Sequence, residues 1–390
     1  MNIAAGLDEE TPMRVLIVDD QPIIAEAVRR MLLPHKNIQL IACIKGSEAL
    51  AKVAEVDPDV ILQDLVMPDA DGLELVSAYR RNPALARTPL IVLSVKEEPS
   101  IKAEAFARGA NDYLVKLPDP LELIARIQYH ARANRAQKER DAVFNALRAE
   151  LDSAAHYVQS LIPEPIEGRV RTRWAFVPSA SLGGDSFGYH WLDENRMAIY
   201  LLDVCGHGVG PALLSVSVMN AMQVNALGGA DLGDPGAVLS ALNEMFPMSK
   251  HNGMFFTMWY GVADLSRREL KYSSGGHPPA LLYTPGGTDK ELGGNEDISG
   301  PMIGAFSGAP YGTATTALLP GAQLFVYSDG IHEIMQEDGT CWALEAFLAN
   351  VSEEVRKGDG SVERLIARSR LIGTRTDFED DVSLLEVTFE

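Results

Sequence analysis

The 390-residue chain is long enough for two or three domains, each with a buried core. Its content of 46% hydrophobic and 23% charged residues is typical of soluble globular proteins and excludes fibrous, low-complexity and membrane-spanning classes. The formal net charge of −20 disfavours nucleic acid or an anionic membrane as the main binding partner.

Residues 13–120 alternate short apolar runs with amphipathic stretches, a pattern that indicates a parallel sheet covered by helices on both faces. Helices are predicted to start near Pro22, Ser47, Gly72 and Pro99, each at a turn or capping residue. The predicted strands are 14–18, 38–43, 60–65, 90–94 and 113–115. Five strands joined by helical crossovers predict a doubly wound α/β domain.

A long helical pattern follows over residues 121–165 and ends at Pro163 and Pro165. Its apolar residues recur at spacings of three and four: Val143, Leu147, Leu151, Val158 and Leu161. This stripe is typical of a parallel two-stranded coiled coil, which would make the chain a homodimer. It fits equally a single linker helix that lies on a neighbouring domain.

Residues 170–390 consist mostly of short β-type runs separated by Gly, Pro, Asp and Asn. Helical stretches are predicted over 210–227 and 235–246, and a third after Glu345. This order of elements favours an α+β sandwich flanked by helices over a further series of βαβ units.

The three cysteines, Cys43, Cys205 and Cys341, lack the spacings of a disulfide framework or a zinc site. The amino-terminal stretch has neither the basic region nor the apolar core of a signal peptide, and no run of about 18 apolar residues occurs. We therefore expect a cytoplasmic protein with reduced thiols.

Polar residues stand where the strands of the first domain end: Asp19 and Asp20 after the first, Asp64 after the third, Ser94 at the fourth and Lys116 after the fifth. Ligands of open parallel sheets bind beyond these strand ends. Three carboxylates at one edge predict a Mg²⁺ site. There Asp64 can attack a phosphoryl group while Mg²⁺ and the Lys116 ammonium neutralise the developing charge.

The motifs VLIVDDQ, ILQDLVMPDADG, IVLSV and GANDYLVK resemble the receiver domain of two-component response regulators over residues 13–120. The resemblance implies a phosphate donor that is a sensor histidine kinase or a phosphotransfer protein. The residues it implies are Asp64 as phosphoacceptor, Asp19, Asp20, Asp64 and the Val66 carbonyl as Mg²⁺ ligands, Ser94 and Lys116 as switch hydroxyl and lysine, and Tyr113 as the switch aromatic. One departure is Leu117, which stands where the family usually has proline.

Aspartates also recur in glycine-rich turns beside the strands of the C-terminal half: Asp185, Asp203, Asp329, Asp380 and Asp381. Carboxylates grouped without histidine or cysteine favour Mg²⁺ or Mn²⁺, and two such ions can activate a water for phosphoester hydrolysis. His207 and His277, both in glycine-flanked loops, are either structural or orient a phosphate.

These turns, together with AHYVQSLIPEP, GHGVGPALLS, MFFTMWYGVAD, SSGGHPPALL, PMIGAF and LFVYSDGIHE, resemble the PP2C-type serine phosphatases of the bacterial sporulation and stress-regulator branch over residues 170–390. The resemblance implies two Mn²⁺ or Mg²⁺ ions. The implied ligands are Asp185, Asp203, Asp329, Asp380 and the Val204 carbonyl, with Asp381 the weaker candidate. Gly188 departs from a pattern that often has an acid at that position.

Together the resemblances lead to the hypothesis that phosphorylation of Asp64 controls a metal-dependent serine/threonine phosphatase, a hydrolase that acts on a phosphorylated anti-sigma-factor antagonist and so regulates a stress sigma factor. The same layout also resembles the adaptor response regulators that bind the general-stress sigma factor and deliver it to an ATP-dependent protease. In that alternative the PP2C-like domain is a binding module. The direction of control, the cognate kinase and the substrate are left open by the sequence.

Overall fold

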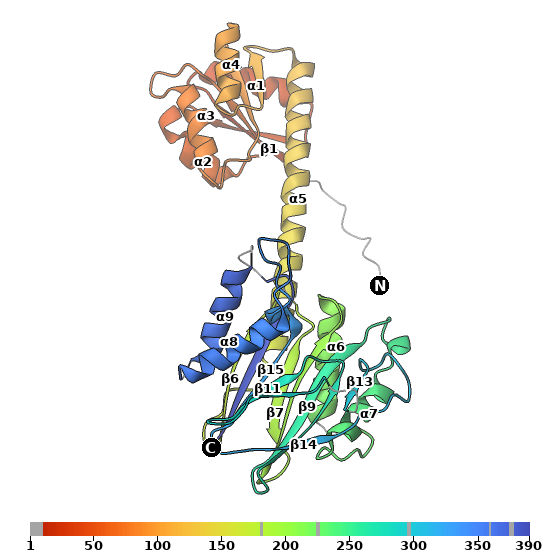
Figure 1. Ribbon diagram of the computed structural model, residues 1–390. Helices are drawn as coiled ribbons and strands as arrows, with labels where there is room; N and C mark the ends of the chain where they lie inside the picture. Colours follow the sequence, from red (N-terminus) through yellow and green to blue (C-terminus); the bar gives the residue numbers. More distant parts are fainter. Residues whose placement is uncertain (1–10, 180–181, 224–226, 295–297, 359, 374–377) are drawn as a thin grey trace. The chain divides into compact units, whose positions relative to one another are not determined.

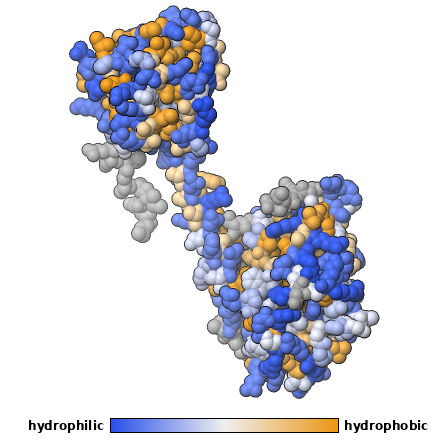
Figure 2. Space-filling model, turned by 90° about the vertical axis from the view of Figure 1, so that its left-hand side faces the viewer, coloured by the Kyte–Doolittle hydropathy of each residue, from blue (hydrophilic) through white to orange (hydrophobic). Residues whose placement is uncertain are grey.

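The computed structural model describes residues 11–179, 182–223, 227–294, 298–358, 360–373 and 378–390. It divides into two units, one up to Leu147 and one from Arg148 (Figure 1). In the view of Figure 2, hydrophilic and hydrophobic side chains are interspersed on the surface of each unit. Each unit is described by itself below.

The first unit is a five-stranded parallel sheet with the strand order β2-β1-β3-β4-β5. Its elements are β1 (Met13–Val18), α1 (Pro22–Leu32), β2 (Ile38–Cys43), the 3₁₀ turn η1 (Gly46–Glu48), α2 (Ala49–Val56), β3 (Val60–Gln63), α3 (Gly72–Arg81), β4 (Leu90–Ser94), α4 (Pro99–Ala107), β5 (Asp112–Val115) and α5 (Pro120–Gln159). The predicted doubly wound fold is confirmed.

Strand β1 shows how the sheet comes to be covered on both faces, because its side chains alternate between them. Val15 and Ile17 pack in a core cluster with α1 and α5. Leu16 and Val18 pack in a second cluster with α2 and α3. All of these strand side chains are at most 1% exposed, so the sheet lies between two helical layers and its functional groups are confined to the strand ends.

Helix α5 is a single run of 40 residues. Its first part buries Leu123, Ile124, Ile127 and Ala131 against the sheet. Farther along, Val143, Phe144 and Leu147 are more than half exposed. Within the described ranges, no helix is both long and apolar enough to cross a bilayer.

The second unit contains two sheets, with strand orders β13-β10-β9-β8-β7 (β14 also pairs with β10) and β12-β11-β15-β16-β6. The strands are β6 (Val170–Val177), β7 (Ser186–Trp191), β8 (Arg196–Val204), β9 (Phe256–Asp264), β10 (Glu269–Gly275), β11 (Ala280–Tyr283), β12 (Lys290–Leu292), β13 (Ser299–Gly300), β14 (Ala314–Ala317), β15 (Gln323–Tyr327) and β16 (Val382–Phe389). The helices are α6 (Val209–Gln223), α7 (Pro235–Met245), α8 (Leu344–Arg356) and α9 (Ser361–Ile372), with 3₁₀ turns η2 (Met248–Lys250) and η3 (Asp329–Ile331).

Three hydrophobic clusters define the layers of this unit. Phe187 and Trp259 of one sheet share a cluster with Leu324 and Leu385 of the other, so the sheets pack face to face. The outer face of the first sheet packs with α6 and α7, and that of the second with α8 and α9. The predicted α+β sandwich flanked by helices is confirmed.

Two predicted helices differ in detail from the structure. Helix α6 ends at Gln223, and the predicted stretch continues over residues 224–226, which lie outside the described residues. The single helix predicted after Glu345 is two helices, α8 and α9. Gly358 and Gly360, with φ of 95° and 83°, separate them, because a left-handed conformation cannot continue a right-handed helix.

Strand pairing gathers four separate turns at one end of the sandwich. The start of β7 pairs with the end of β8, since Ser186 lies opposite Leu202. The end of β15 pairs with the start of β16, since Tyr327 lies opposite Leu384. Strand β8 also contacts β15, and β7 contacts β16, across the sandwich. The turns before β7, after β8, after β15 and before β16 therefore meet.

Candidate functional sites

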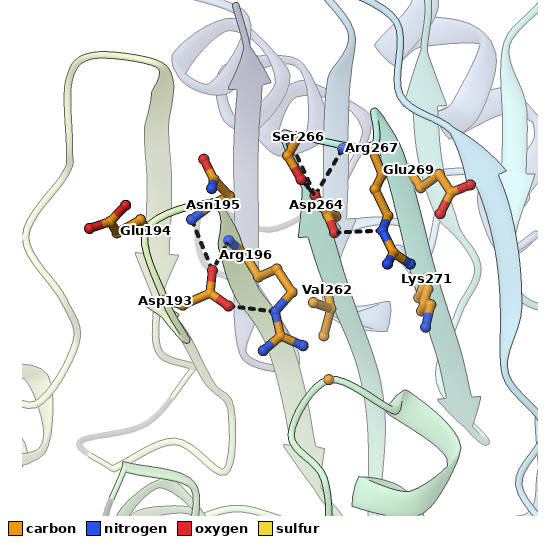
Figure 3. Close-up of a pocket in the computed structure, with 11 residues that line it drawn as sticks. Asp193, Glu194, Asn195, Arg196, Val262, Asp264, Ser266, Arg267, Glu269 and Lys271 are labelled. Carbon is orange, nitrogen blue, oxygen red and sulfur yellow. Dashed lines mark hydrogen bonds and ion pairs between the residues drawn. The ribbon is translucent and has the colours of Figure 1, made fainter.

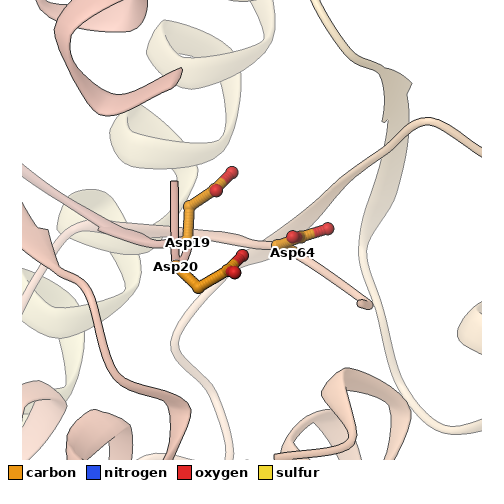
Figure 4. Close-up of side chains that lie close together, drawn as sticks. All are labelled: Asp19, Asp20 and Asp64. Atoms are coloured by element: carbon orange, nitrogen blue, oxygen red, sulfur yellow. The ribbon is translucent and has the colours of Figure 1, made fainter. Parts of the chain in front are cut away.

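The first unit brings three predicted aspartates together at the carboxyl edge of its sheet. Carboxylate oxygens of Asp19, Asp20 and Asp64 all lie within 4.8 Å of one another (Figure 4). Asp19 and Asp64 are 1% and 3% exposed, and a buried oxygen of Asp20 has no hydrogen-bond partner among the described residues. A hard divalent cation such as Mg²⁺ fits this oxygen-only donor set, because it would neutralise the mutual repulsion of the carboxylates.

Lys116 lies against the same carboxylates. Its Nζ is 2.8 Å from Oδ2 of Asp19 and 2.8 Å from Oδ2 of Asp64, and its side chain is 4% exposed. Burial alone would lower the pKa of Lys116, but the hydrogen bonds to Asp19 and Asp64 leave it raised, so the ammonium stays charged. Burial raises the pKa of Asp19 in spite of the same lysine.

The other predicted receiver residues lie on β4 and β5 or in the loop after β3. The backbone N–H of Lys96 donates to Oγ of Ser94 at 3.3 Å, and the Tyr113 hydroxyl donates to the Lys96 carbonyl at 2.5 Å. Val66 follows in the loop after β3, and its N–H donates to Oδ1 of Asp64 at 3.3 Å. The peptide bond between Lys116 and Leu117 is cis.

The loop that carries Asp64 is held close to helix α3 by two residues. Asp71 caps that helix, since its Oδ1 accepts hydrogen bonds from Leu73 N at 2.8 Å and Glu74 N at 3.3 Å. A Cβ added at Gly72 would lie 2.2 Å from the Asp64 carbonyl oxygen, so only glycine permits this approach.

The second unit places its aspartates at the end of the sandwich where the four turns meet. Asp185 directly precedes β7, and Asp203 is the second-last residue of β8. Asp329 opens η3 directly beyond β15 and Ser328. Asp380 precedes β16 and its Oδ1 accepts a hydrogen bond from the N–H of Asp381 at 2.8 Å.

Glycines make the close approach of these turns feasible. A Cβ at Gly184 would lie 2.6 Å from the Val204 carbonyl oxygen, so the turn before β7 approaches the end of β8 through a position with no side chain. A Cβ at Gly330 would lie 2.3 Å from the Asp381 carbonyl oxygen. At both positions the atom that a Cβ would meet belongs to the backbone, so no side chain can move aside to make room. Both positions therefore require glycine.

Burial and mutual repulsion raise the pKa values of three carboxyl groups in this site. Burial, and then the neighbouring Asp203 carboxylate, raise the pKa of Asp185 well above its ordinary value. Burial, with Asp329 and Asp380 nearby, raises the pKa of Asp203 to about 7. Burial, Glu333 and Asp380 raise the pKa of Asp329 to about 6. Such shifts mark a site that favours added positive charge.

The donor set fits divalent ions. Both carboxylate oxygens of Asp185 are buried, and neither has a hydrogen bond of standard geometry to a described residue. Among the described residues, only the receiver trio brings three ligand atoms within 4.8 Å of one another. No such trio forms among the described aspartates of the second unit.

Asp381 has another role, which the sequence did not reveal. Its Oδ1 accepts hydrogen bonds from Ser179 N at 2.8 Å and Ser179 Oγ at 3.0 Å, and its Oδ2 accepts from Gly184 N at 2.7 Å. The carboxylate is 3% exposed and is occupied by backbone and hydroxyl donors. Asp381 thus anchors the segment that leads to Asp185.

The departure at Gly188 has a structural counterpart. Gly188 lies opposite Tyr200 in the β7–β8 pair, and a Cβ there would be 2.4 Å from the Tyr200 hydroxyl. Tyr200 is 1% exposed and stacks on Tyr260 at a centroid distance of 6.4 Å. The space that an acid at position 188 would need is therefore filled by a tyrosine ring.

The second unit also has a hollow of about 510 Å³ (Figure 3). None of the candidate ligands Asp185, Asp203, Asp329 and Asp380 is among the residues that line it. It is lined by the turns from Asp193 to Arg196 and from Asp264 to Lys271. Arg196 opens β8, whereas Asp203 lies seven residues farther along that strand, roughly 23 Å away at about 3.3 Å per residue. Two arginines of its lining form ion pairs with nearby aspartates, Arg196 with Asp193 at 2.7 Å and Arg267 with Asp264 at 3.8 Å.

Comparison with known proteins finds families and relatives that match each half of the chain. The profile of the family described as stage II sporulation protein E (SpoIIE) matches residues 193–390, and that of the response regulator receiver domain matches residues 15–128. The phosphoserine phosphatase RsbP of Bacillus subtilis is 28% identical over 203 residues, which are 51% of this chain and 48% of RsbP.

Two further similarities each cover a part of the chain. The transcriptional regulatory protein ResD of Bacillus subtilis is 35% identical over 122 residues, 31% of this chain and 49% of ResD. The solved SiaA-PP2C domain of Pseudomonas aeruginosa superposes with a TM-score of 0.55 at 20% identity and covers 64% of this chain and 99% of that domain, which shows a shared fold. The chain thus spans about half the length of RsbP and of ResD.

Proposed function

Because this chain belongs to the SpoIIE family and also contains a response regulator receiver domain, we propose that it is a response regulator in which phosphorylation of Asp64 controls a metal-dependent serine/threonine phosphatase. The observation that carries the proposal is the convergence of aspartates at one end of the sandwich, where Asp185 is buried without a hydrogen bond of standard geometry and the pKa values of Asp185 and Asp203 are both raised.

In the receiver domain, Asp64 is the group that accepts the phosphoryl. Its carboxylate attacks phosphorus, the bond to the donor's leaving group breaks, and the acyl phosphate remains on Asp64. Lys116, already 2.8 Å from Asp64, balances the added negative charge. Asp19 and Asp20 would hold the Mg²⁺ ion, and Ser94 stands at the end of β4 to bond the new phosphoryl oxygens.

In the phosphatase domain, Asp185, Asp203, Asp329 and Asp380 would hold the metal ions, with the Val204 carbonyl beside them. Divalent ions at such a site would activate a water and stabilise the negative charge on the phosphoryl group during its transfer. The aspartates fix where that chemistry occurs, because each sits at a strand end or on a short turn of the sandwich. Asp185, which is 2% exposed, lies where electrostatic interactions are stronger than in bulk water.

The substrate we propose is a phosphoserine or phosphothreonine of a small anti-sigma-factor antagonist, whose dephosphorylation would alter the activity of a stress sigma factor. The similarity to a protein named phosphoserine phosphatase supports the substrate class. The receiver domain supports a sensor histidine kinase or phosphotransfer protein as the phosphate donor.

The test is hydrolysis of a phosphoserine protein by the full chain with Mn²⁺, with and without beryllofluoride as a mimic of the Asp64 phosphate. We expect Asp203→Asn to lose at least about 100-fold in kcat, because it removes a central ligand. Asp64→Ala should retain basal hydrolysis and lose the response to beryllofluoride. A chain that is inert toward every phosphoserine substrate yet binds a sigma factor would overturn the proposal in favour of the adaptor function.

A further inference from the structure

His277 is a buried histidine between the two sheets of the phosphatase domain that the proposed mechanism does not use. It is 4% exposed and lies on the segment between β10 and β11, where the chain crosses from one sheet to the other. This crossing occurs at the end of the sandwich that holds the aspartates, because Gly275 at the end of β10 lies opposite Met258 near the start of β9.

On one side, His277 contacts the strand next to the one that carries Asp203. Its Nδ1 lies 2.8 Å from Oγ1 of Thr257. Thr257 is the cross-strand partner of Asp203 in the antiparallel pair of β8 and β9. Directly opposed residues of an antiparallel pair project on the same face of the sheet, so the Thr257 hydroxyl and the Asp203 carboxylate are neighbours.

On the other side, the ring faces the strand that leads to Asp329. Burial lowers the pKa of His277, and the nearby backbone of Tyr327, two residues before Asp329, partly offsets that effect. Nε2 has no hydrogen bond of standard geometry within the described part of the chain. The contact with Thr257 is compatible with either tautomer of the neutral ring, because the hydroxyl can donate to Nδ1 or accept from it.

The backbone around His277 is held in place by the same elements. Oγ of Ser274 on β10 donates to the His277 carbonyl at 3.0 Å. The hydroxyl of Tyr327 on β15 donates to the Pro279 carbonyl at 2.6 Å. Burial lowers the pKa of His277 to about 3, so the ring is neutral at physiological pH and adds no positive charge that would compete with metal ions.

We infer that His277 is a positioning residue that ties the strand pair bearing Asp203 to the strand leading to Asp329, and so fixes the spacing of two ligands contributed by different sheets. This inference rests on the proposed metal-dependent phosphatase. It concerns Asp203 and Asp329, which are carried by different sheets. Neighbouring groups that orient metal ligands typically change metal affinity by about 10- to 100-fold when removed.

The test measures Mn²⁺ affinity of the full chain by electron paramagnetic resonance of free Mn²⁺, in an Asp20→Asn background that disables the receiver site. We expect His277→Ala to weaken Mn²⁺ binding about tenfold, and His277→Asn, whose side-chain amide can replace Nδ1, to restore most of it. Thr257→Val, which removes only a hydroxyl, should weaken binding in the same direction. The double variant should be no worse than His277→Ala alone, because both changes break one connection.

The matched control is His190→Ala on β7, which removes a partly buried imidazole whose ring meets that of Tyr200 edge-on. It should leave Mn²⁺ affinity unchanged. Equal affinity in wild type, His277→Ala and Thr257→Val would overturn the inference, as would fully additive losses in the double variant. If His277→Ala fails to fold in the presence of chelator, Thr257→Val alone decides. Absence of Mn²⁺ binding by the Asp20→Asn parent would instead count against the proposed phosphatase.

Discussion

At the scale of single residues, adjacent aspartates in this chain have different roles. Asp380 accepts one hydrogen bond, from the following N–H, and is exposed, whereas Asp381 is buried and accepts three. The paired letters in the sequence do not distinguish them. Only the fold distinguishes them, because it places Asp381 beside Ser179 and Gly184 as an anchor and leaves Asp380 as a candidate metal ligand.

Asp381→Ala should therefore act first on stability. Loss of charge-assisted hydrogen bonds from a buried carboxylate should cost about 2–4 kcal/mol in the free energy of unfolding, measured with urea. Asp381→Asn should lose less, since the amide oxygen can still accept from Ser179. Asp338→Ala, which removes a carboxylate bonded to Thr340 in an exposed turn, serves as control. Unchanged stability in Asp381→Ala with complete loss of Mn²⁺ binding would show instead that Asp381 is a ligand.

Residue types and their order were sufficient to predict the receiver cluster. Asp19, Asp64 and Lys116 each follow a strand of a parallel sheet, so a correct assignment of strands already places them at one edge. Thr257 could not be found in this way. A threonine within a β run carries no signal by itself, and its place beside Asp203 depends on the pairing of β8 with β9.

At the scale of elements, helix α5 is tied to the base of the receiver sheet. Arg135 forms a two-pronged ion pair with Asp59, with Nε at 3.0 Å from Oδ1 and Nη2 at 2.7 Å from Oδ2. Asn134, 7% exposed, donates from Nδ2 to the Asp59 carbonyl at 3.1 Å. The periodicity of this helix was readable in the sequence, but its attachment through a charged pair was not, because a helical arginine is usually solvated.

The exposed stretch of α5 carries the stripe predicted to form a coiled coil. Leu147 is 54% exposed and Val143, four residues earlier, is 64% exposed. Two such stripes from two copies would bury each other's apolar side chains, so we propose a homodimer through this helix. Leu147→Lys should shift the chain from dimer to monomer in light scattering coupled to size exclusion.

The matched control for this prediction introduces the same lysine two residues away. Asn145 projects about 200° around the helix from Leu147, so Asn145→Lys should leave the mass unchanged. A wild-type chain that is already monomeric at micromolar concentration, or a dimer that tolerates Leu147→Lys, would contradict this role of the helix.

At the scale of the whole molecule, several of the acidic residues behind the net charge of −20 lie in the two candidate metal sites. Their ionisation makes the free energy of unfolding depend on pH. Burial raises the pKa of Asp203 to about 7, well above its value of about 3.9 in an unfolded chain. A carboxyl with a raised folded-state pKa binds more protons when folded. Its contribution to stability is therefore present at acid pH and is lost as pH rises from about 4 to 7.

Without metal, Asp203→Asn should accordingly raise Tm at pH 8, because it removes a buried charge that burial and its neighbours disfavour. The gain should be several degrees, at roughly 2–4 °C per kcal/mol for a unit of this size, and should shrink at pH 5.5, where Asp203 is protonated. Added Mn²⁺ should reverse the order, since ligand binding stabilises only a chain that retains the site. Equal Tm values at pH 8 in chelator would argue against a strained carboxylate cluster.

The architecture itself was largely predictable. Alternation of strand and helix patterns gave the receiver fold, and the succession of short β runs gave the sandwich. The division after Glu345 into α8 and α9 was missed because Gly358 and Gly360 stand in a polar stretch that reads as an ordinary helix end. Contacts between distant turns, such as that of Gly184 with the Val204 carbonyl, follow only from three-dimensional packing.

Helix α5 is continuous over 40 residues, so its length determines the rotation about the helix axis of whatever follows it. Each residue added to or removed from a helix turns everything beyond it by about 100° and moves it by about 1.5 Å. Changes of seven residues nearly preserve the face on which Leu147 lies, whereas changes of two rotate it to the opposite side. Related chains that keep the same coupling through this helix are therefore expected to differ in linker length by whole heptads.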